Sequence, residues 1–190
     1  MRSGSNPTAL IPVAALAAAT FAGACDSPDA EALGEAEAAA PPVVALVDSS
    51  AVRNLTYMSQ FTETGFVTLV DGEFLDDEQH IQAALDPRMA FGNLDDDEAD
   101  EAAAILGTNT GGSGGFLDLA VVEDREGKAV NSAILYLGDR LRVHALSIVD
   151  SEIVLDVTMH APDDPMCCPS LRTVRRFHLE RGALVEVGGQ

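Results

Sequence analysis

The alternation of apolar and polar residues predicts a series of short β-strands over the C-terminal two fifths of the chain. In Glu152 to His160, Ile153 and every second residue after it are apolar, while Asp156 and Thr158 lie on the opposite face. Five further segments are rich in β-branched residues and are separated by turn residues: Phe116 to Val122, Ala129 to Leu137, Leu141 to Val149, Leu171 to Leu179 and Ala183 to Val187. The predicted fold is mainly β, a twisted antiparallel meander that coils into a sandwich or partial barrel.

The sheet is predicted to begin upstream of these segments. Apolar residues recur through Ala51 to Ser59 and again through Phe66 to Val70. The second stretch is followed by Asp71-Gly72 and then by Glu73 to Leu75. Because an Asp-Gly pair between apolar runs favours a two-residue turn, these residues predict a β-hairpin.

The next segment fits two kinds of secondary structure. Ile81 and Leu85 have helical spacing after a capping aspartate, but with Ala83 between them they also alternate as in a strand. A short helix at residues 77–85 would make the fold α+β, the alternative to a mainly β fold. Pro87 is expected to end either element.

The N-terminal residues have the layout of an export signal. Residues 1–24 carry Arg2, no acidic residue, the apolar stretch LIPVAALAAATFAGA and a small-residue end at Ala22-Gly23-Ala24. This order predicts a signal peptide. The segment resembles a bacterial lipoprotein leader, which implies that Cys25 is lipidated and becomes the first residue of the mature protein. Ordinary cleavage, giving a secreted or soluble periplasmic protein, is the alternative.

Residues 25–48 are dominated by Ala, Glu, Asp and Pro, a composition that buries little apolar surface. We expect a disordered tether, followed by a single β-rich domain at 49–190. The whole chain has 190 residues, 47% of them apolar, so the domain is long enough to bury a core. With 31 acidic and 11 basic residues, the formal charge of -20 argues against nucleic-acid partners.

An acidic turn offers candidate ligands for a cation. Asn93, Asp95 and Asp97 alternate, and Asp100 or Glu101 follows with a further carboxylate. Oxygen donors at alternate positions of a tight loop are the pattern that wraps Ca²⁺. The sequence therefore offers a weak Ca²⁺ site, with a solvated acidic turn as the competing interpretation.

Two other groups of residues suggest a reactive site, one around a serine and one around a pair of cysteines. Gly111 to Gly115 formally satisfies G-x-S-x-G around Ser113, but a nucleophile elbow needs a helix after the turn, and a strand is predicted there. The adjacent Cys167 and Cys168, in an oxidising compartment, are predicted to form a vicinal disulfide that locks a loop. The four histidines are scattered singly, without the spacing of a zinc motif.

An ordered set of motifs resembles a family of uncharacterised exported bacterial proteins, many of them lipoproteins. The motifs are AFGNLDDDEADEAA, NTGGSGGFLDLAVV, G-x-x-V-N-x-A, L-G-D-R and DDPMCCP, between about Ala83 and Leu184. In these relatives the acidic turn is similar to the calcium loops of FG-GAP and dockerin-type repeats. The resemblance implies ligand-like positions at Asn93, Asp95, Asp97 and Asp100, and it implies no activity.

These observations together predict a membrane-tethered extracytoplasmic lipoprotein domain with a non-enzymatic binding or scaffolding role. Its partners would be the membrane, through the lipid anchor on Cys25, and an envelope or extracellular ligand. One alternative is a secreted hydrolase that uses Ser113 or an acidic pair such as Asp97 and Asp118. The other is a redox or metal sensor built on the vicinal cysteines.

Overall fold

The computed structural model describes residues 47–95, 97 and 99–188. Every described residue belongs to one compact unit, Pro42–Gln190. The predicted signal peptide, Cys25 and the predicted tether up to residue 46 lie outside the described residues. Within the part that the structure describes, no helix combines the length and the apolar character needed to cross a membrane.

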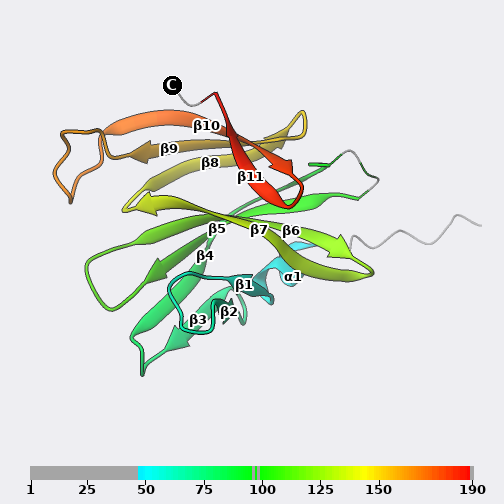
Figure 1. The fold of residues 1–190 in the computed structure, drawn as a ribbon, viewed down its shortest axis with the longest axis horizontal. Coiled ribbons are helices and arrows are strands. Elements are labelled where there is room, and N and C mark those ends of the chain that lie inside the picture. Colours follow the sequence, from blue (N-terminus) through cyan, green and yellow to red (C-terminus); the bar gives the residue numbers. More distant parts are fainter. Residues whose placement is uncertain (1–46, 96, 98, 189–190) are drawn as a thin grey trace, which may run out of the picture. The chain divides into compact units, whose positions relative to one another are not determined.

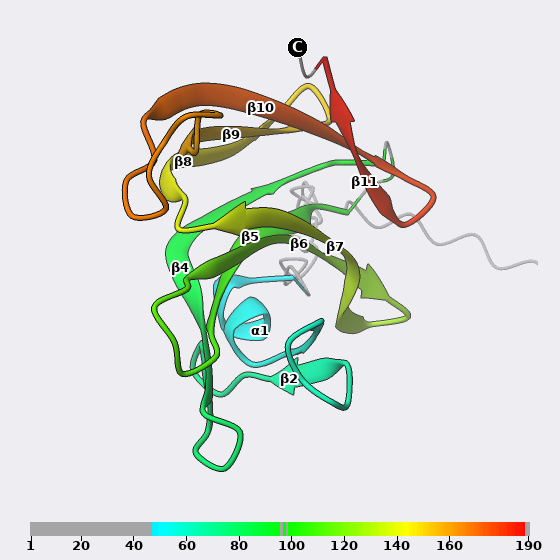
Figure 2. The ribbon, with the colours of Figure 1, turned by 60° about the vertical axis from the view of Figure 1, so that its left-hand side comes forward.

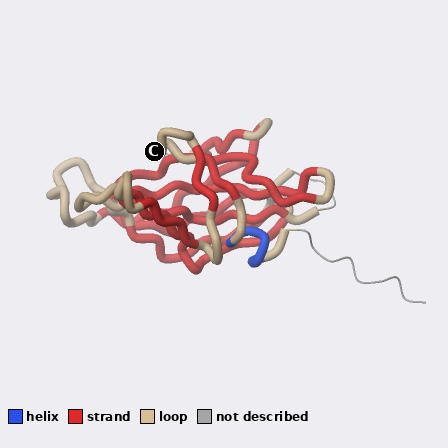
Figure 3. The backbone as a smooth tube through the Cα atoms, turned by 90° about the horizontal axis from the view of Figure 1, so that it is seen from below, coloured by secondary structure: helices blue, strands red, loops and turns tan. Residues whose placement is uncertain are grey.

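The described chain folds into antiparallel β-sheets, as predicted, with one five-residue helix, α1 (Figure 3). A five-stranded sheet has the order β3-β4-β5-β6-β7, a four-stranded sheet has the order β11-β10-β9-β8, and β1 pairs with β2. The elements are α1 (Ser49–Arg53), β1 (Thr56–Met58), β2 (Phe66–Thr68), β3 (Glu73–Asp76), β4 (Ile81–Gly92), β5 (Glu101–Asn109), β6 (Phe116–Arg125), β7 (Lys128–Asp139), β8 (Arg142–Val149), β9 (Glu152–Met159), β10 (Leu171–Glu180) and β11 (Ala183–Val187).

The five-stranded sheet is covered on both faces. The four-stranded sheet lies on one side of it, and α1, β1 and β2 lie on the other (Figures 1 and 2). Each interface encloses an apolar core, one with Ile105, Leu119 and Phe177 and the other with Val52, Tyr57 and Leu106. Strand β5 is therefore buried on both sides, which explains its unbroken apolar run.

Three two-residue turns connect neighbouring strands where the sequence predicted turns. They are Glu126-Gly127, Asp150-Ser151 and Arg181-Gly182, and both residues of each turn have positive φ. This conformation matches the right-handed twist of the strands that it joins. The strands predicted from Phe116 to Val187 are accordingly confirmed as β6 to β11.

The first predicted strand is partly wrong. Residues 49–53 form α1, because the Asp48 carboxylate accepts the Ala51 N–H at 2.8 Å and caps the helix. The Tyr57 hydroxyl then donates to the Val52 carbonyl and fixes the helix against β1. Val47 is buried beside this helix, so the packed region begins just before residue 49.

The predicted hairpin around Asp71-Gly72 is only partly present. Both turn residues have positive φ, and Val70 bridges Glu73 across the turn. Beyond that bridge the two strands separate, because β2 pairs with β1 and β3 pairs with β4. The turn was predictable from local sequence, whereas these pairings depend on contacts distant along the chain.

The helix considered for residues 77–85 is not formed. Ile81, Ala83 and Leu85 alternate into the core as part of β4. Pro87 does not end this strand, contrary to the prediction. The pairing with β5 shifts between Leu85 and Met89, so the proline lies within a bulge, where no ladder hydrogen bond is required from it.

Candidate functional site

The acidic turn between β4 and β5 brings three carboxylates together. One oxygen from each of Asp95, Asp97 and Glu101 lies within 4.8 Å of the others. Asp95 and Asp97 are exposed, whereas Glu101 is 1% exposed. The predicted donors Asp95 and Asp97 are thus joined by the first residue of β5.

Burial sets the electrostatics of this cluster. Removal from water raises the pKa of Glu101 to about 7. The Leu94 N–H donates to Glu101 Oε2 at 2.6 Å and opposes that rise, while the nearby Asp95 and Asp97 add to it. Among the described residues, no Lys, Arg or His forms an ion pair with these three carboxylates.

The other two predicted ligands have different surroundings. The Asn93 side-chain amide donates a hydrogen bond to the Asp97 carbonyl and so helps to close the turn. The Asp100 side chain is exposed and is not one of the three clustered carboxylates. Asp95 and Asp97 each accept a backbone N–H two residues further on, the hydrogen bond of an Asx turn.

The glycine-rich loop lies at the other end of β5 and joins it to β6, so G-x-S-x-G here lies between two antiparallel strands. Asn109 organises the loop by accepting the Gly111 N–H and donating to the Gly112 and Gly114 carbonyls. The Ser113 hydroxyl accepts from Arg140 at 3.3 Å. A guanidinium cannot act as the general base that a serine nucleophile needs.

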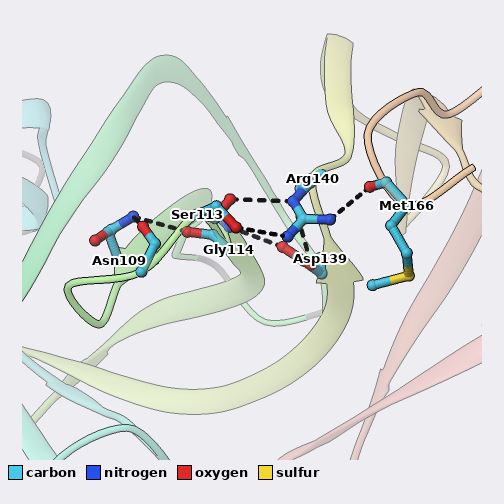
Figure 4. A network of polar contacts seen from close by, with 8 residues as sticks. Asn109, Ser113, Gly114, Asp139, Arg140 and Met166 are labelled. Carbon is cyan, nitrogen blue, oxygen red and sulfur yellow. Dashed lines mark hydrogen bonds and ion pairs between the residues drawn. The ribbon is translucent and has the colours of Figure 1, made fainter.

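Arg140 connects three loops that carry sequence motifs (Figure 4). Its guanidinium donates to the Ser113 carbonyl at 3.1 Å and to the Met166 carbonyl at 2.5 Å. Asp139 lies 3.6 Å from the same guanidinium and also accepts the Gly115 N–H at 2.7 Å. The L-G-D-R motif therefore ties the glycine loop to the cysteine loop.

Cys167 and Cys168 form a vicinal disulfide in the loop between β9 and β10, as the sequence predicted. Asp164 holds the same loop by accepting the backbone N–H groups of Ala161 and Ser170, each at 2.7 Å, and the Ser170 hydroxyl. Both cysteines are exposed.

The two acids considered as a catalytic pair lie far apart. Asp118 on β6 opposes Leu106, five residues beyond Glu101 along β5. At about 3.4 Å per strand residue this separation is roughly 17 Å, and Asp97 lies beside Glu101. Asp118 is nearly buried, which raises its pKa to about 6.

An open groove crosses the five-stranded sheet near the glycine loop. It encloses about 720 Å³, and its walls include Arg140 and Leu141 from the segment between β7 and β8. Ala84, Gly107 and Leu117 are paired neighbours on β4, β5 and β6, so they share one face and form the floor. Gly107 adds no side chain to this floor, and a Cβ placed there would meet Leu117 Cδ2 at 3.4 Å.

A smaller hollow of about 290 Å³ continues the groove toward the β3–β4 turn. The two share Leu75, Gln82 and Asn109 in their walls. Asp76, Asp77 and His80 line this second part. The combined groove thus has an apolar floor and an acidic end. We call Asp76 and Asp77, together with Glu73 at the start of β3 in the wall of the larger part, the acidic end of the groove.

No protein-family model, curated protein or solved structure matches this chain.

Sequence reasoning did not find the groove or the role of Arg140. The groove walls come from β3, β4, β5, β6 and the β7–β8 connection, which become neighbours only in the folded sheet. One of its main features is the missing side chain at Gly107. The L-G-D-R motif was the single available signal for Arg140.

Proposed function

We propose that this chain is an extracytoplasmic, non-enzymatic binding domain that is held at a membrane by lipid on Cys25. The groove across the five-stranded sheet is the observation that carries the binding role. It has the size of a small-molecule site and combines an apolar floor with a few polar groups at the rim. The leader, the tether and the resemblance to exported lipoproteins support the location.

A neutral apolar dye tests the groove directly. N-phenyl-1-naphthylamine fluorescence should rise in the presence of the full mature chain carrying Cys25→Ser. Gly107→Val should remove most of the rise, because valine adds bulk to a floor position that has no side chain in the parent chain. The backbone of Gly107 does not have positive φ, so valine is compatible with the strand.

The control variant is Glu180→Val, which adds a valine at an exposed position of β10. It should leave the dye signal at the level of the parent chain. No rise with the parent chain, or an equal rise with Gly107→Val, would contradict binding in the groove.

A second candidate function is weak Ca²⁺ binding at the acidic turn. The support is the approach of the Asp95, Asp97 and Glu101 oxygens to within 4.8 Å without a basic ion-pair partner among the described residues. Carboxylate oxygens are the donors that Ca²⁺ prefers, and bound Ca²⁺ would relieve their mutual repulsion. Affinity in the weak extracellular range, around ~10⁻³ M, fits the small number of charged donors.

Thermal denaturation with and without Ca²⁺ at about 10 mM, roughly tenfold above that dissociation constant, tests this site. The melting temperature of the parent chain should rise by a few degrees, a rise that Glu101→Gln should abolish. Asp100→Asn is the matched control, because Asp100 lies outside the cluster, and it should keep the rise. An unchanged melting temperature in the parent chain would leave only a solvated acidic turn.

A further inference from the structure

We propose that the groove takes an elongated apolar ligand that ends in a primary ammonium or guanidinium group, with this cation at the acidic end. This inference rests on the proposed function of the groove as a binding site. It adds the chemical class of the ligand and the direction in which the ligand lies.

The apolar half of the groove fits a chain without polar groups. Its floor is the row Ala84, Gly107 and Leu117, and Leu141 stands at its far wall. Leu75, on β3, is 60% exposed on the same side of the sheet. Covering this leucine with an apolar chain would remove its side chain from water, which is favourable.

The long direction of the groove runs across the strands. Its walls include residues of β3, β4, β5 and β6, which are successive neighbours in the sheet. With about 4.8 Å between neighbouring strands, the path from β3 to β6 covers roughly 14 Å. An extended chain fits this path better than a compact ring.

The acidic end supplies negative charge that forms no ion pair with the described residues, and His80 is the one basic side chain among the described residues that line the same hollow. The carboxylates of Glu73 and Asp77 are exposed and form no hydrogen bond or ion pair with the part of the chain that the structure describes. One oxygen of Asp76 accepts the backbone N–H groups of Glu78 and Gln79, each at 3.0 Å, which fixes that carboxylate in place. A cation with N–H donors complements this end.

The positive charge at the other end is already engaged. Arg140 donates to the carbonyls of Ser113 and Met166, and the Asp139 carboxylate lies 3.6 Å away. This arrangement weakens the attraction of an anionic group to Arg140, while Glu73 and Asp77 repel such a group. The charges around the groove therefore favour a cationic ligand.

Three probes with the same ten-carbon chain test the inference. The full mature chain carrying Cys25→Ser is titrated with n-decylammonium, n-decanol and n-decanoate below their micellar concentrations, at low salt, by calorimetry. We expect n-decylammonium to bind about two- to fivefold more tightly than n-decanol, the scale of exposed charge pairs, and n-decanoate to bind most weakly. Added salt should reduce the difference between the probes.

Two double variants identify the source of the preference. Glu73→Gln with Asp77→Asn leaves only Asp76 charged at this end and should bring n-decylammonium most of the way to the affinity of n-decanol without changing n-decanol binding. Glu126→Gln with Glu180→Gln removes the same net charge at exposed positions outside the groove walls and should keep the preference. Equal loss of preference in both double variants would contradict a specific role for the acidic end.

The outcomes separate this inference from the proposed function. Equal affinities of the parent chain for n-decylammonium and n-decanol, both lost in Gly107→Val, would overturn the cationic ligand and keep the groove as a binding site. Absence of binding by all three probes would overturn both. Binding that Gly107→Val does not weaken would place the probes elsewhere and would also overturn both.

Discussion

Among the residues that the structure describes, Asp118 and Glu101 are the two carboxyl groups that the fold buries almost completely, at 4% and 1% exposure. Burial raises both pKa values, to about 6 for Asp118 and to about 7 for Glu101. Glu101 has a backbone hydrogen bond and three acidic neighbours, whereas burial alone shifts Asp118. Asp118 is thus the simpler residue for a test of pH dependence.

Asp118→Asn should make the free energy of unfolding less dependent on pH. The folded-state pKa is raised, so the stability associated with protonated Asp118 is fully present below about pH 4 and is lost as the pH rises through about 6. Between pH 4 and pH 8, the free energy of unfolding of the variant should therefore rise by about 2 kcal/mol relative to that of the parent chain. Urea unfolding at both pH values measures this. If the variant and the parent chain differ in free energy of unfolding by the same amount at both pH values, burial does not raise the pKa of Asp118.

Arg140, which lies between β7 and β8, connects two loops of the structure. Its contacts with Ser113 and Met166 join the glycine loop to the cysteine loop. Arg140→Met should leave the sheets folded and speed amide hydrogen exchange in both loops. Arg142→Met on β8 is the control, because Arg142 is exposed and has no hydrogen bond or ion pair to other described side chains. Equal exchange in the Arg140 and Arg142 variants would contradict the connecting role.

At the scale of elements, the cysteine loop has two independent restraints. The disulfide closes a ring within adjacent residues, whereas Asp164 joins the two ends of the loop at Ala161 and Ser170. A ring so small removes little entropy from the unfolded chain. The disulfide should accordingly contribute less to global stability than a long-range disulfide.

Replacing both Cys167 and Cys168 by serine should lower the free energy of unfolding by no more than about 2 kcal/mol. Circular dichroism should show an unchanged sheet, because Asp164 still holds the loop. Asp164→Ala, with the disulfide retained, should make the loop more sensitive to proteases than the serine variant does. Global unfolding of the double serine variant would contradict the small contribution of the disulfide to global stability.

The sequence predicted those elements whose signals are local. Strands β6 to β11 alternate or carry β-branched residues, and turns such as Glu126-Gly127 need residues that accept positive φ. Helix α1 was missed because its cap, Asp48, lay in a segment whose composition predicts disorder. Strand β4 passes Pro87 only because a bulge, set by pairing with β5, removes the need for a hydrogen bond there.

The candidate sites likewise divide into those with a local sequence signal and those that depend on long-range strand pairing. Asp95 and Asp97 were predicted because alternate acidic residues in a turn are visible in sequence, and the disulfide was predicted because Cys167 and Cys168 are adjacent. The groove could not be predicted, since it depends on strand pairing and on the absence of a side chain at Gly107. Long-range register determines such a surface, and no local pattern reports it.

At the scale of the whole molecule, lipidation of Cys25 would place the folded domain at a membrane. The mature protein should sediment with membranes, and Cys25→Ser should release it into the soluble fraction, because acyl chains provide the attachment. Intact-mass analysis of the mature chain should show the added lipid on Cys25. An unmodified Cys25 would contradict the anchor and favour ordinary secretion.

Residue-resolved NMR shows directly whether the groove on the five-stranded sheet binds a ligand. The ¹⁵N-labelled mature chain carrying Cys25→Ser is titrated with n-decylammonium, and amide shifts are mapped onto the structure. Binding in the groove predicts saturable shifts at Ala84, Gly107 and Leu117 and at Glu73 and Asp77, with little change at Glu180. Shifts that are absent from the groove, or that concentrate on the four-stranded sheet, would contradict it.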